Sequence, residues 1–333
     1  MISFSIVICT YNPDTSIFER LLRAVDNFIP SKMYNYDIII VDNNSFPEIL
    51  KNEGVVSFLN KNKNASILVE KKAGLTNARI AGIKAAKGNW IIFFDDDNEP
   101  SLHYLDELNL IINLYPNVGC WGPGNIKVKF IGENTPEWLL DYKEIFQEKQ
   151  NTKLEYSDKK CWQNEYPFGT GLCILKTIAN EYVLKVQKGI YSLSDRKRNT
   201  LSSGGDVQIV LTAISLDYFA GTSPNLQINH LISSKKTTFN YLIRLVYGTA
   251  SSSLPAHYQV FPEEFKIVYV PSELENIKKI YYYIKNNFKE VGFIGILIKV
   301  SAYLGELKGV YLIRKDVNPG LFFVILTRTL FLR

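Results

Sequence analysis

Short apolar runs alternate with helical patterns through the first hundred residues, and this alternation restricts the chain to few folds. The runs, rich in β-branched and aromatic side chains, cover residues 4–9, 36–41, 66–69 and 90–94. Residues 17–25 and 76–86, which lie between runs, carry helical patterns. Continuous apolar strands separated by helices indicate a parallel sheet that is buried on both faces. The sequence therefore predicts an α/β fold with a mostly parallel central sheet flanked by helices.

Polar clusters follow three of these strands. They are Thr10, Tyr11 and Asn12 after the first strand, Asp42 and Asn43 after the second, and Asp95, Asp96 and Asp97 after the fourth. Ligands of such sheets bind outside the carboxyl ends of the strands, so we expect a binding site here. The ring of Tyr11 could lie on a nucleobase, and Asp42 could accept a hydrogen bond from a base N–H. The alternative is ordinary turn and cap chemistry, which these residue types favour.

The acidic run is the strongest of these signals. Three carboxylates at the end of a buried strand repel one another unless a cation or solvent relieves them. Strand alternation predicts Asp95 and Asp97 on one side and Asp96 on the other. Oxygen ligands at this spacing suit Mn²⁺ or Mg²⁺, and His230 is a candidate third ligand or phosphate contact. The alternatives are a solvated acidic turn and a structural histidine.

Two further segments complete the candidate chemistry. Gly74 precedes a predicted helix, and a glycine at a helix N-terminus lets the backbone approach an anion such as phosphate. Arg79 adds a cation that can pair with phosphate. Asp206 stands before an apolar helical run and could accept a proton as a general base. The alternative is that Thr76 and Asp206 act only as N-caps.

Basic charge gathers near the C-terminus. The chain carries 38 Lys and Arg against 33 Asp and Glu, a net charge of +5, which gives no argument for a nucleic-acid partner. From Asn276 onward there are ten basic and three acidic residues, a net of +7, together with apolar and aromatic clusters. Two interpretations stay open. The segment packs with its lysines in water, or it lies on the inner face of the plasma membrane.

Other sequence features indicate a cytoplasmic protein. The first residues lack the basic stretch of a secretion signal. No apolar run reaches the roughly 18 residues of a membrane span. The four cysteines have no zinc or redox spacing, and Cys9, inside the first apolar run, is expected to be a small buried side chain.

The motifs together resemble the family 2 glycosyltransferases of the GT-A fold. The resemblance rests on FSIVICTYNP at 4–13, DIIIVDNNS at 37–45, GLTNARIAG at 74–82 and GNWIIFFDDDN at 88–98. It continues more weakly through FGTGLCILK at 168–176, and residues 229–248 look like bacterial polysaccharide-type members. It covers about three quarters of the chain.

The resemblance implies a role for each candidate residue. Nucleotide and donor binding fall to Thr10, Tyr11, Asn12, Asp42, Gly74, Asn77, Arg79, Asp95 and Asp96. Metal binding falls to Asp97, the more direct ligand, and to Asp95, while His230 stays a candidate metal ligand from its place in the sequence alone. Asp206 matches the catalytic base, and the family implies inversion at the anomeric carbon. Gly205 departs from the pattern, because members commonly carry an acid there.

The resemblance also implies substrates and an organisation. The donor would be a nucleotide-sugar, with a UDP-sugar favoured, and the acceptor a glycan or lipid-linked sugar in bacterial surface glycan assembly. Residues 1–260 would form the transferase domain, with a donor part at 1–118 and an acceptor and catalytic part at 119–260. Residues 261–333 would form a helical, basic appendage.

Two other functions compete with this one. A nucleotidyltransferase shares the architecture, but it needs a glycine-rich basic loop where this chain has Thr10 to Pro13. A degenerate, nucleotide-sugar-binding scaffold subunit is supported only by Gly205. Donor hydrolysis with Mn²⁺ separates an active transferase from a scaffold.

Overall fold

The computed structural model describes residues 1–29, 31–132, 134–193, 195–196 and 200–331. They fold into two compact units. Met1–Ser192 with Asp206–Thr237 form one, here called the sheet unit, and Leu193–Gly205 with Thr238–Arg333 form the other, the helical unit. The division by function at residues 118 and 260 stays a prediction.

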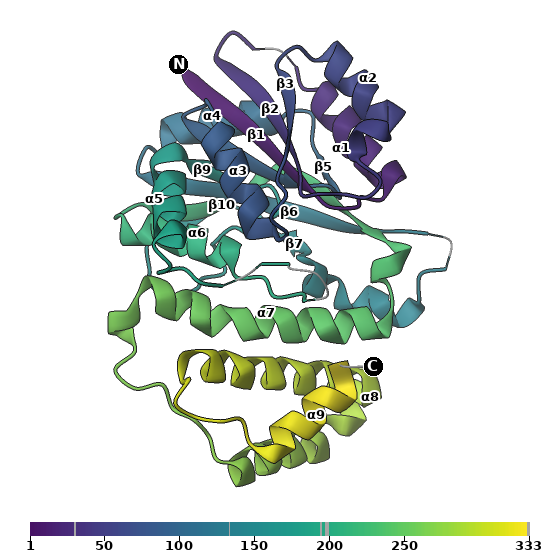
Figure 1. The fold of residues 1–333 in the computed structure, drawn as a ribbon, viewed down its shortest axis with the longest axis vertical. Coiled ribbons are helices and arrows are strands. Elements are labelled where there is room, and N and C mark those ends of the chain that lie inside the picture. The colour runs from purple at the N-terminus through teal and green to yellow at the C-terminus, as the bar shows by residue number, and fades with distance from the viewer. Residues whose placement is uncertain (30, 133, 194, 197–199, 332–333) are drawn as a thin grey trace. The chain divides into compact units, whose positions relative to one another are not determined.

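The sheet unit is built on one ten-stranded sheet (Figure 1). Its strands are β1 (Ile2–Thr10), β2 (Tyr34–Asp42), β3 (Ala65–Val69), β4 (Trp90–Asp95), β5 (Asn98–Pro100), β6 (Val118–Ile131), β7 (Lys149–Gln150), β8 (Glu155–Ser157), β9 (Cys173–Leu175) and β10 (Phe219–Ser233). The main order is β3-β2-β1-β4-β9-β6-β10-β5, with β7 on β6 and β8 on β10. The four predicted strands are confirmed as β1 to β4, and they pair in parallel. The rest of the sheet is mixed, since β9 runs antiparallel to both β4 and β6.

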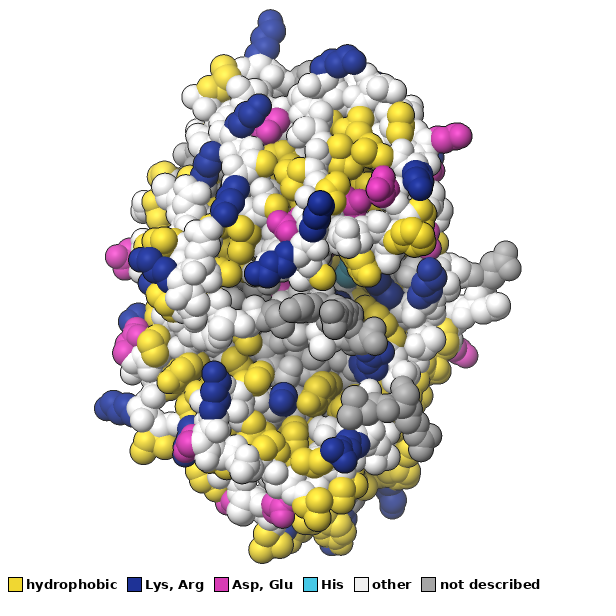
Figure 2. All heavy atoms as spheres, viewed as in Figure 1, with side chains coloured by type: hydrophobic (Ala, Val, Ile, Leu, Met, Phe, Trp, Pro, Cys, Tyr) yellow, Lys and Arg dark blue, Asp and Glu magenta, His cyan; other side chains and the backbone are white. Residues whose placement is uncertain are grey.

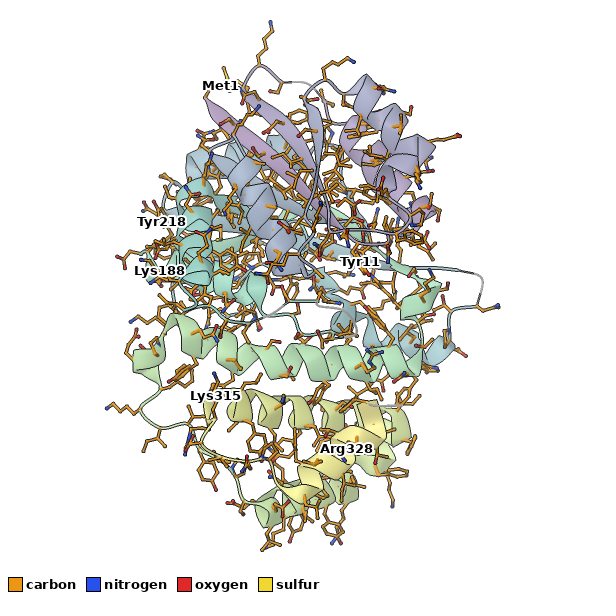
Figure 3. The ribbon with its side chains drawn as sticks, in the orientation of Figure 1. Met1, Tyr11, Lys188, Tyr218, Lys315 and Arg328 are labelled. Atoms are coloured by element: carbon orange, nitrogen blue, oxygen red, sulfur yellow. The ribbon has the colours of Figure 1, made fainter. Side chains whose placement is uncertain are left out.

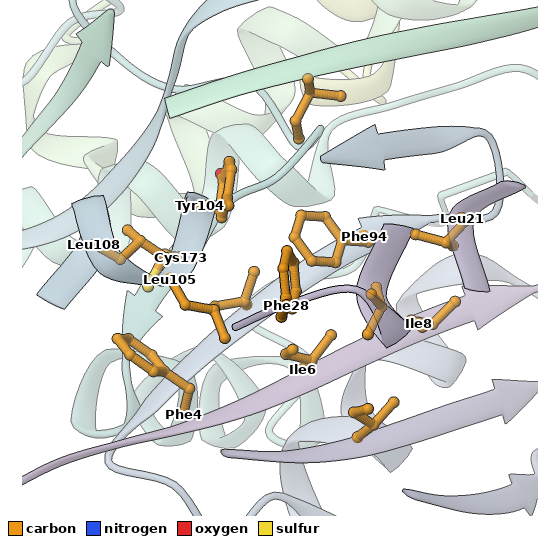
Figure 4. Close-up of a cluster of buried hydrophobic side chains, with 14 of the residues drawn as sticks. Phe4, Ile6, Ile8, Leu21, Phe28, Phe94, Tyr104, Leu105, Leu108 and Cys173 are labelled. Atoms are coloured by element: carbon orange, nitrogen blue, oxygen red, sulfur yellow. The ribbon is translucent and has the colours of Figure 1, made fainter. Parts of the chain in front are cut away.

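Helices cover both faces of this sheet. They are α1 (Thr15–Asp26), α2 (Glu53–Lys61), α3 (Leu75–Ala85), α4 (Tyr104–Leu114), α5 (Lys176–Gln187) and α6 (Gly205–Ser215). Because side chains alternate along a strand, Ile6 and Ile8 of β1 face one side and Val7 the other. Ile6 and Ile8 join a core with apolar residues of α1, α2 and α4 (Figure 4). Val7 lies under α3, where a Cβ on Gly82 would come within 2.3 Å of it. The predicted α/β fold is confirmed.

The described residues of the helical unit form three helices and one short 3-10 turn, Pro262–Glu264. These helices are α7 (Phe239–Val260), α8 (Glu273–Ile313) and α9 (Leu321–Phe331). A capping box between Ser272 and Glu275 starts α8, and Gly292 (φ 64°) breaks it into two helical segments. Ile296, Leu304 and Phe323 belong to the buried core of this unit. Within the described part of the chain, no helix has the length and apolarity to cross a membrane.

Cys9 is buried, as predicted from its place in the first apolar run. Burial is the main reason why the pKa of its thiol rises to about 12, against a smaller opposing effect of Arg79. A thiol with such a pKa stays protonated and unreactive at neutral pH. Cys9 therefore serves packing under the site described next.

Candidate active site

The polar clusters meet because their strands are neighbours. Thr10 at the end of β1 is paired with Asp42 on β2, and Cys9 is paired with Asp95 on β4. The carboxyl ends of three parallel strands therefore form one edge of the sheet. This is the place at which such sheets bind ligands.

The loops after β1 and β2 are tied to each other. Asn12, in the left-handed region at φ 47°, donates its N–H to Ser45 Oγ at 2.9 Å and accepts the Phe46 N–H at 2.7 Å. Asp42 is buried, and its Oδ1 accepts the Ser45 N–H at 2.9 Å. One oxygen of Asp42 thus stabilises the turn after β2, and the contact of Asp42 with a nucleobase stays a prediction. Tyr11, labelled in Figure 3, is 58% exposed, so its ring is accessible to a planar ligand.

Asn43 connects this edge to the start of α3, a role that the sequence did not reveal. Its Oδ1 accepts the Gly74 N–H at 2.8 Å, and its Nδ2 donates to the carbonyls of Glu70 and Lys72, both at 2.9 Å. Gly74 has φ 122° and ψ 139°, a conformation that favours glycine. An asparagine directly after a strand reads as a turn residue, and only the folded chain shows its three backbone contacts.

The first turns of α3 present groups suited to an anion. The buried Thr76 hydroxyl has no hydrogen-bond partner among the residues that the structure describes. Asn77 donates to the Ala73 carbonyl at 3.0 Å, so its side chain is held at the start of the helix. Arg79 is 4% exposed, and its guanidinium lies 5.8 Å from the centre of the Phe93 ring. A buried cation beside a helix N-terminus is chemically suited to phosphate.

Arg79 and Asp206 converge on Gly169. Asp206 Oδ2 accepts the Gly169 N–H at 3.1 Å, and Oδ1 accepts the Val207 N–H at 3.0 Å. A Cβ on Gly169 would lie 3.1 Å from both Arg79 Nη2 and Asp206 Oδ2. A side chain at this position would therefore crowd the two charged groups. The motif at 168–176 includes Gly169, but the sequence did not reveal its place between a candidate phosphate ligand and the candidate base.

The acidic run divides as soon as β4 ends at Asp95. Residues 96 and 97 form a turn, so strand alternation does not fix their directions. Asp96 Oδ2 accepts the Thr10 hydroxyl at 2.7 Å. Burial, and then the neighbouring charge of Asp97, raise the pKa of Asp96 to about 7. The sheet edge thus holds one carboxyl that resists ionisation and is fixed by Thr10.

Asp97 lies in a different environment, between two basic side chains. Lys236 Nζ donates to its Oδ2 at 2.6 Å, and His230 Nε2 lies 3.4 Å from its Oδ1. Burial opposes ionisation of Asp97, but Lys236 and His230 outweigh it and hold the pKa of this carboxyl well below its usual range. The structure therefore brings together two of the predicted metal ligands and adds Lys236, which sequence reasoning missed.

Asp97 and His230 fit a divalent cation. His230 Nδ1 lies 2.8 Å from the Phe146 carbonyl and donates to it, so Nε2, the ring nitrogen that faces Asp97, is the one that could bind a metal after losing its proton. Adjacent ligands of an octahedral cation at about 2.1 Å lie about 3 Å apart, close to the observed 3.4 Å. Across the described ranges, no three His, Cys, Asp or Glu side chains form such a group, so the part of Asp95 stays a prediction. Two protein ligands suffice where phosphates complete the shell.

Comparison with known proteins identifies the family. The model of glycosyl transferase family 2 matches residues 5–174, which is 170 of the 333 residues and just over half of the chain. The match contains the site residues from Thr10 to Asp97, while Asp206 and His230 lie beyond it. No curated protein matches the chain significantly.

Solved structures support the same fold. The mannosyltransferase PcManGT from Pyrobaculum calidifontis, in complex with GDP-Man and Mn²⁺, matches with a TM-score of 0.52 and 13% identity, over 98% of this chain and 78% of that chain. GalNAc-T7 with UDP, GalNAc and Mn²⁺ matches with a TM-score of 0.50 and 18% identity, over 88% of this chain and 57% of that chain. At such identities the likeness concerns the fold. With the family match, it shows that the chain belongs to glycosyl transferase family 2 and is a glycosyltransferase of the GT-A fold.

Proposed function

We propose that this glycosyltransferase is metal-dependent and inverting. It moves a sugar from a nucleoside-diphosphate donor, with UDP-sugar favoured, to a hydroxyl of a glycan or lipid-linked sugar in bacterial surface glycan assembly. The reaction takes place at the inner face of the plasma membrane. One observation carries the proposal: Arg79 Nη2 and Asp206 Oδ2 each lie 3.1 Å from the position that a Cβ on Gly169 would occupy. A cation for the leaving diphosphate and a base for the acceptor are thus neighbours.

The transfer needs one proton acceptor and one group that receives negative charge. Asp206 takes the proton of the acceptor hydroxyl as its oxygen attacks the anomeric carbon. The bond from that carbon to the diphosphate breaks on the opposite face, so the configuration inverts. Negative charge grows on the leaving diphosphate, where Arg79 and the first turn of α3 counter it.

The other site residues position the donor. A Mn²⁺ or Mg²⁺ ion, when held by Asp97 and His230, supplies positive charge to the diphosphate. Thr10 fixes Asp96 by a hydrogen bond of 2.7 Å, which keeps this carboxyl next to the metal ligands in one orientation. Tyr11 and Asp42 are assigned to the base, and Asn77 to the ribose or phosphate.

Lys236 is expected to compete with the metal in the absence of donor. Its ammonium occupies one oxygen of Asp97 at 2.6 Å, so a second cation meets repulsion there. Lys236→Met should therefore raise the affinity for Mn²⁺ alone by about fivefold or more, since like charges at this distance repel by at least about 1 kcal/mol. It should also weaken binding of metal-free nucleoside diphosphate, because a cation is lost. Titration of Mn²⁺ followed by electron paramagnetic resonance gives the metal affinity, and calorimetry without metal gives the nucleotide affinity.

Lys235→Met is the matched control for this variant. Lys235 neighbours Lys236 in the chain and is exposed. The substitution Lys235→Met should leave the Mn²⁺ affinity unchanged. Equal Mn²⁺ affinity of the parent and Lys236→Met would show that Lys236 does not compete with the metal for Asp97.

A panel of nucleotides tests the proposed donor. The panel consists of UDP, GDP and dTDP, each with and without Mn²⁺. Only the nucleotide with the matching base should raise the melting temperature of the protein, and it should do so more strongly with Mn²⁺. We expect UDP to give the largest rise. The two structural neighbours do not decide the base, since one was crystallised with GDP-Man and the other with UDP. The donor assignment fails if no nucleoside diphosphate shifts the melting temperature.

A further inference from the structure

The first segment of α8, residues 273–291, carries an exposed apolar stripe. It consists of Leu274, Ile277, Tyr281, Ile284 and Phe288, at alternating steps of three and four residues. This spacing puts the five side chains on one face of the helix. Their exposed fractions run from 38% for Ile284 to 60% for Leu274. Single exposed apolar side chains are common on protein surfaces, but a continuous row of large ones marks an interaction surface.

Another face of the same segment already holds it in the helical unit. Asn276 is 2% exposed, and its Oδ1 accepts the Tyr303 hydroxyl at 2.5 Å. Ile280 and Tyr283 pack against the buried core of the unit. The segment is thus anchored without the apolar stripe, which stays available for another contact.

Lysines border the stripe. Lys278, Lys285 and Lys289 each directly follow a stripe residue, so they lie about 100° further round the helix, on the same flank. All three are exposed. On the face seen in Figure 2, apolar and basic side chains lie side by side over the helical unit. The segment therefore combines an apolar face with a positive border.

A second copy of the chain fits this surface poorly. The stripe spans about two heptads, whereas a coiled coil needs at least three or four. Two such helices paired through their stripes would also place lysines near lysines. An anionic lipid surface meets both features, because apolar side chains enter the interface and lysines reach the headgroups.

We infer that this stripe and its lysine border dock the chain on an anionic membrane surface. The inference gives the membrane part of the proposed function a specific surface, but it does not depend on sugar transfer. Vesicle binding needs no donor or metal, so either proposal can fail alone.

Co-sedimentation of the full chain with vesicles tests this inference. We expect binding to phosphatidylcholine vesicles that contain phosphatidylserine, weaker binding at high salt, and little binding to phosphatidylcholine alone. The triple variant Ile277→Gln, Tyr281→Gln and Phe288→Gln should lose most binding. A matched control replaces three exposed helical leucines, Leu110, Leu114 and Leu184, by Gln and should bind as the parent does.

Removal of the lysine border should act separately. Each of Lys278→Gln, Lys285→Gln and Lys289→Gln should lower the partition coefficient about fivefold on anionic vesicles. Donor hydrolysis without vesicles should stay unchanged in all of these variants. Failure of the parent to sediment with anionic vesicles at low salt would overturn the inference. Vesicle binding by the triple stripe variant equal to that of the parent would also overturn it. A dimer that the parent and the control variant form in solution, and that the stripe variant does not form, would overturn it as well.

Discussion

Asp206→Asn is expected to lower the rate of sugar transfer by roughly 10²–10⁴-fold, the usual contribution of a general base. The amide cannot take the proton of the acceptor hydroxyl. Asp206 also accepts two backbone N–H groups, from Gly169 and Val207, and the amide can accept only one of them. A small loss of stability is therefore expected, of about 1–3 kcal/mol for an unsatisfied buried N–H. Initial rates and donor binding by calorimetry separate this loss from catalysis, because binding should be retained.

Asp195→Asn is the matched control. Asp195 is also a buried carboxylate that accepts a backbone N–H, from Gly204 at 3.0 Å. It should have a comparable structural effect and keep transfer. If Asp206→Asn transfers sugar at the parental rate, the base lies elsewhere, and Asp195 and Glu165 are the next carboxylates to test.

Asp97→Asn is expected to abolish the stimulation by Mn²⁺ and to lower donor turnover by about 10²–10³-fold, since a metal ion supplies several kcal/mol of charge stabilisation. Binding of nucleoside diphosphate with Mn²⁺ should weaken as well. The variant should fold, because the Lys236 side chain is 34% exposed and can turn to water. Calorimetric titration of Mn²⁺ with nucleotide present measures the loss.

Asp26→Asn provides the comparison for Asp97→Asn. Asp26 also accepts a lysine, Lys61, and an asparagine, Asn62, and it lies outside the candidate site. It should lose the lysine contact without any change in Mn²⁺ dependence. Parental affinity for donor and metal in Asp97→Asn would place the metal at other ligands.

The framework of the site was predictable because it depends on local patterns. The apolar runs predicted the four parallel strands, and the polar residues that follow them predicted the edge at which Thr10, Asp42 and Asp95 meet. This inference needs only the rule that the ends of neighbouring parallel strands share an edge. The buried state of Cys9 followed from the same runs.

The contacts that complete the site were not predictable, because they join distant segments. Lys236 reaches Asp97 across 139 positions, and Gly169 reaches Asp206 across 37. No spacing rule connects such pairs. The side on which Asp97 lies was also beyond strand periodicity, since β4 ends two residues before it. The helical unit likewise joins two segments that are distant in the sequence, Leu193–Gly205 and Thr238–Arg333.

The anomer of the sugar released from the matching donor separates an active inverting transferase from the alternatives. Transferases leak sugar to water, and proton NMR can follow the anomer that appears first. With Mn²⁺ and an α-linked nucleotide-sugar, we expect early release of the β-anomer, and we expect this release to be lost on chelation of the metal. Early release of the α-anomer would contradict inversion. No release with any nucleotide-sugar in the panel would contradict an active transferase and favour a scaffold that only binds the donor.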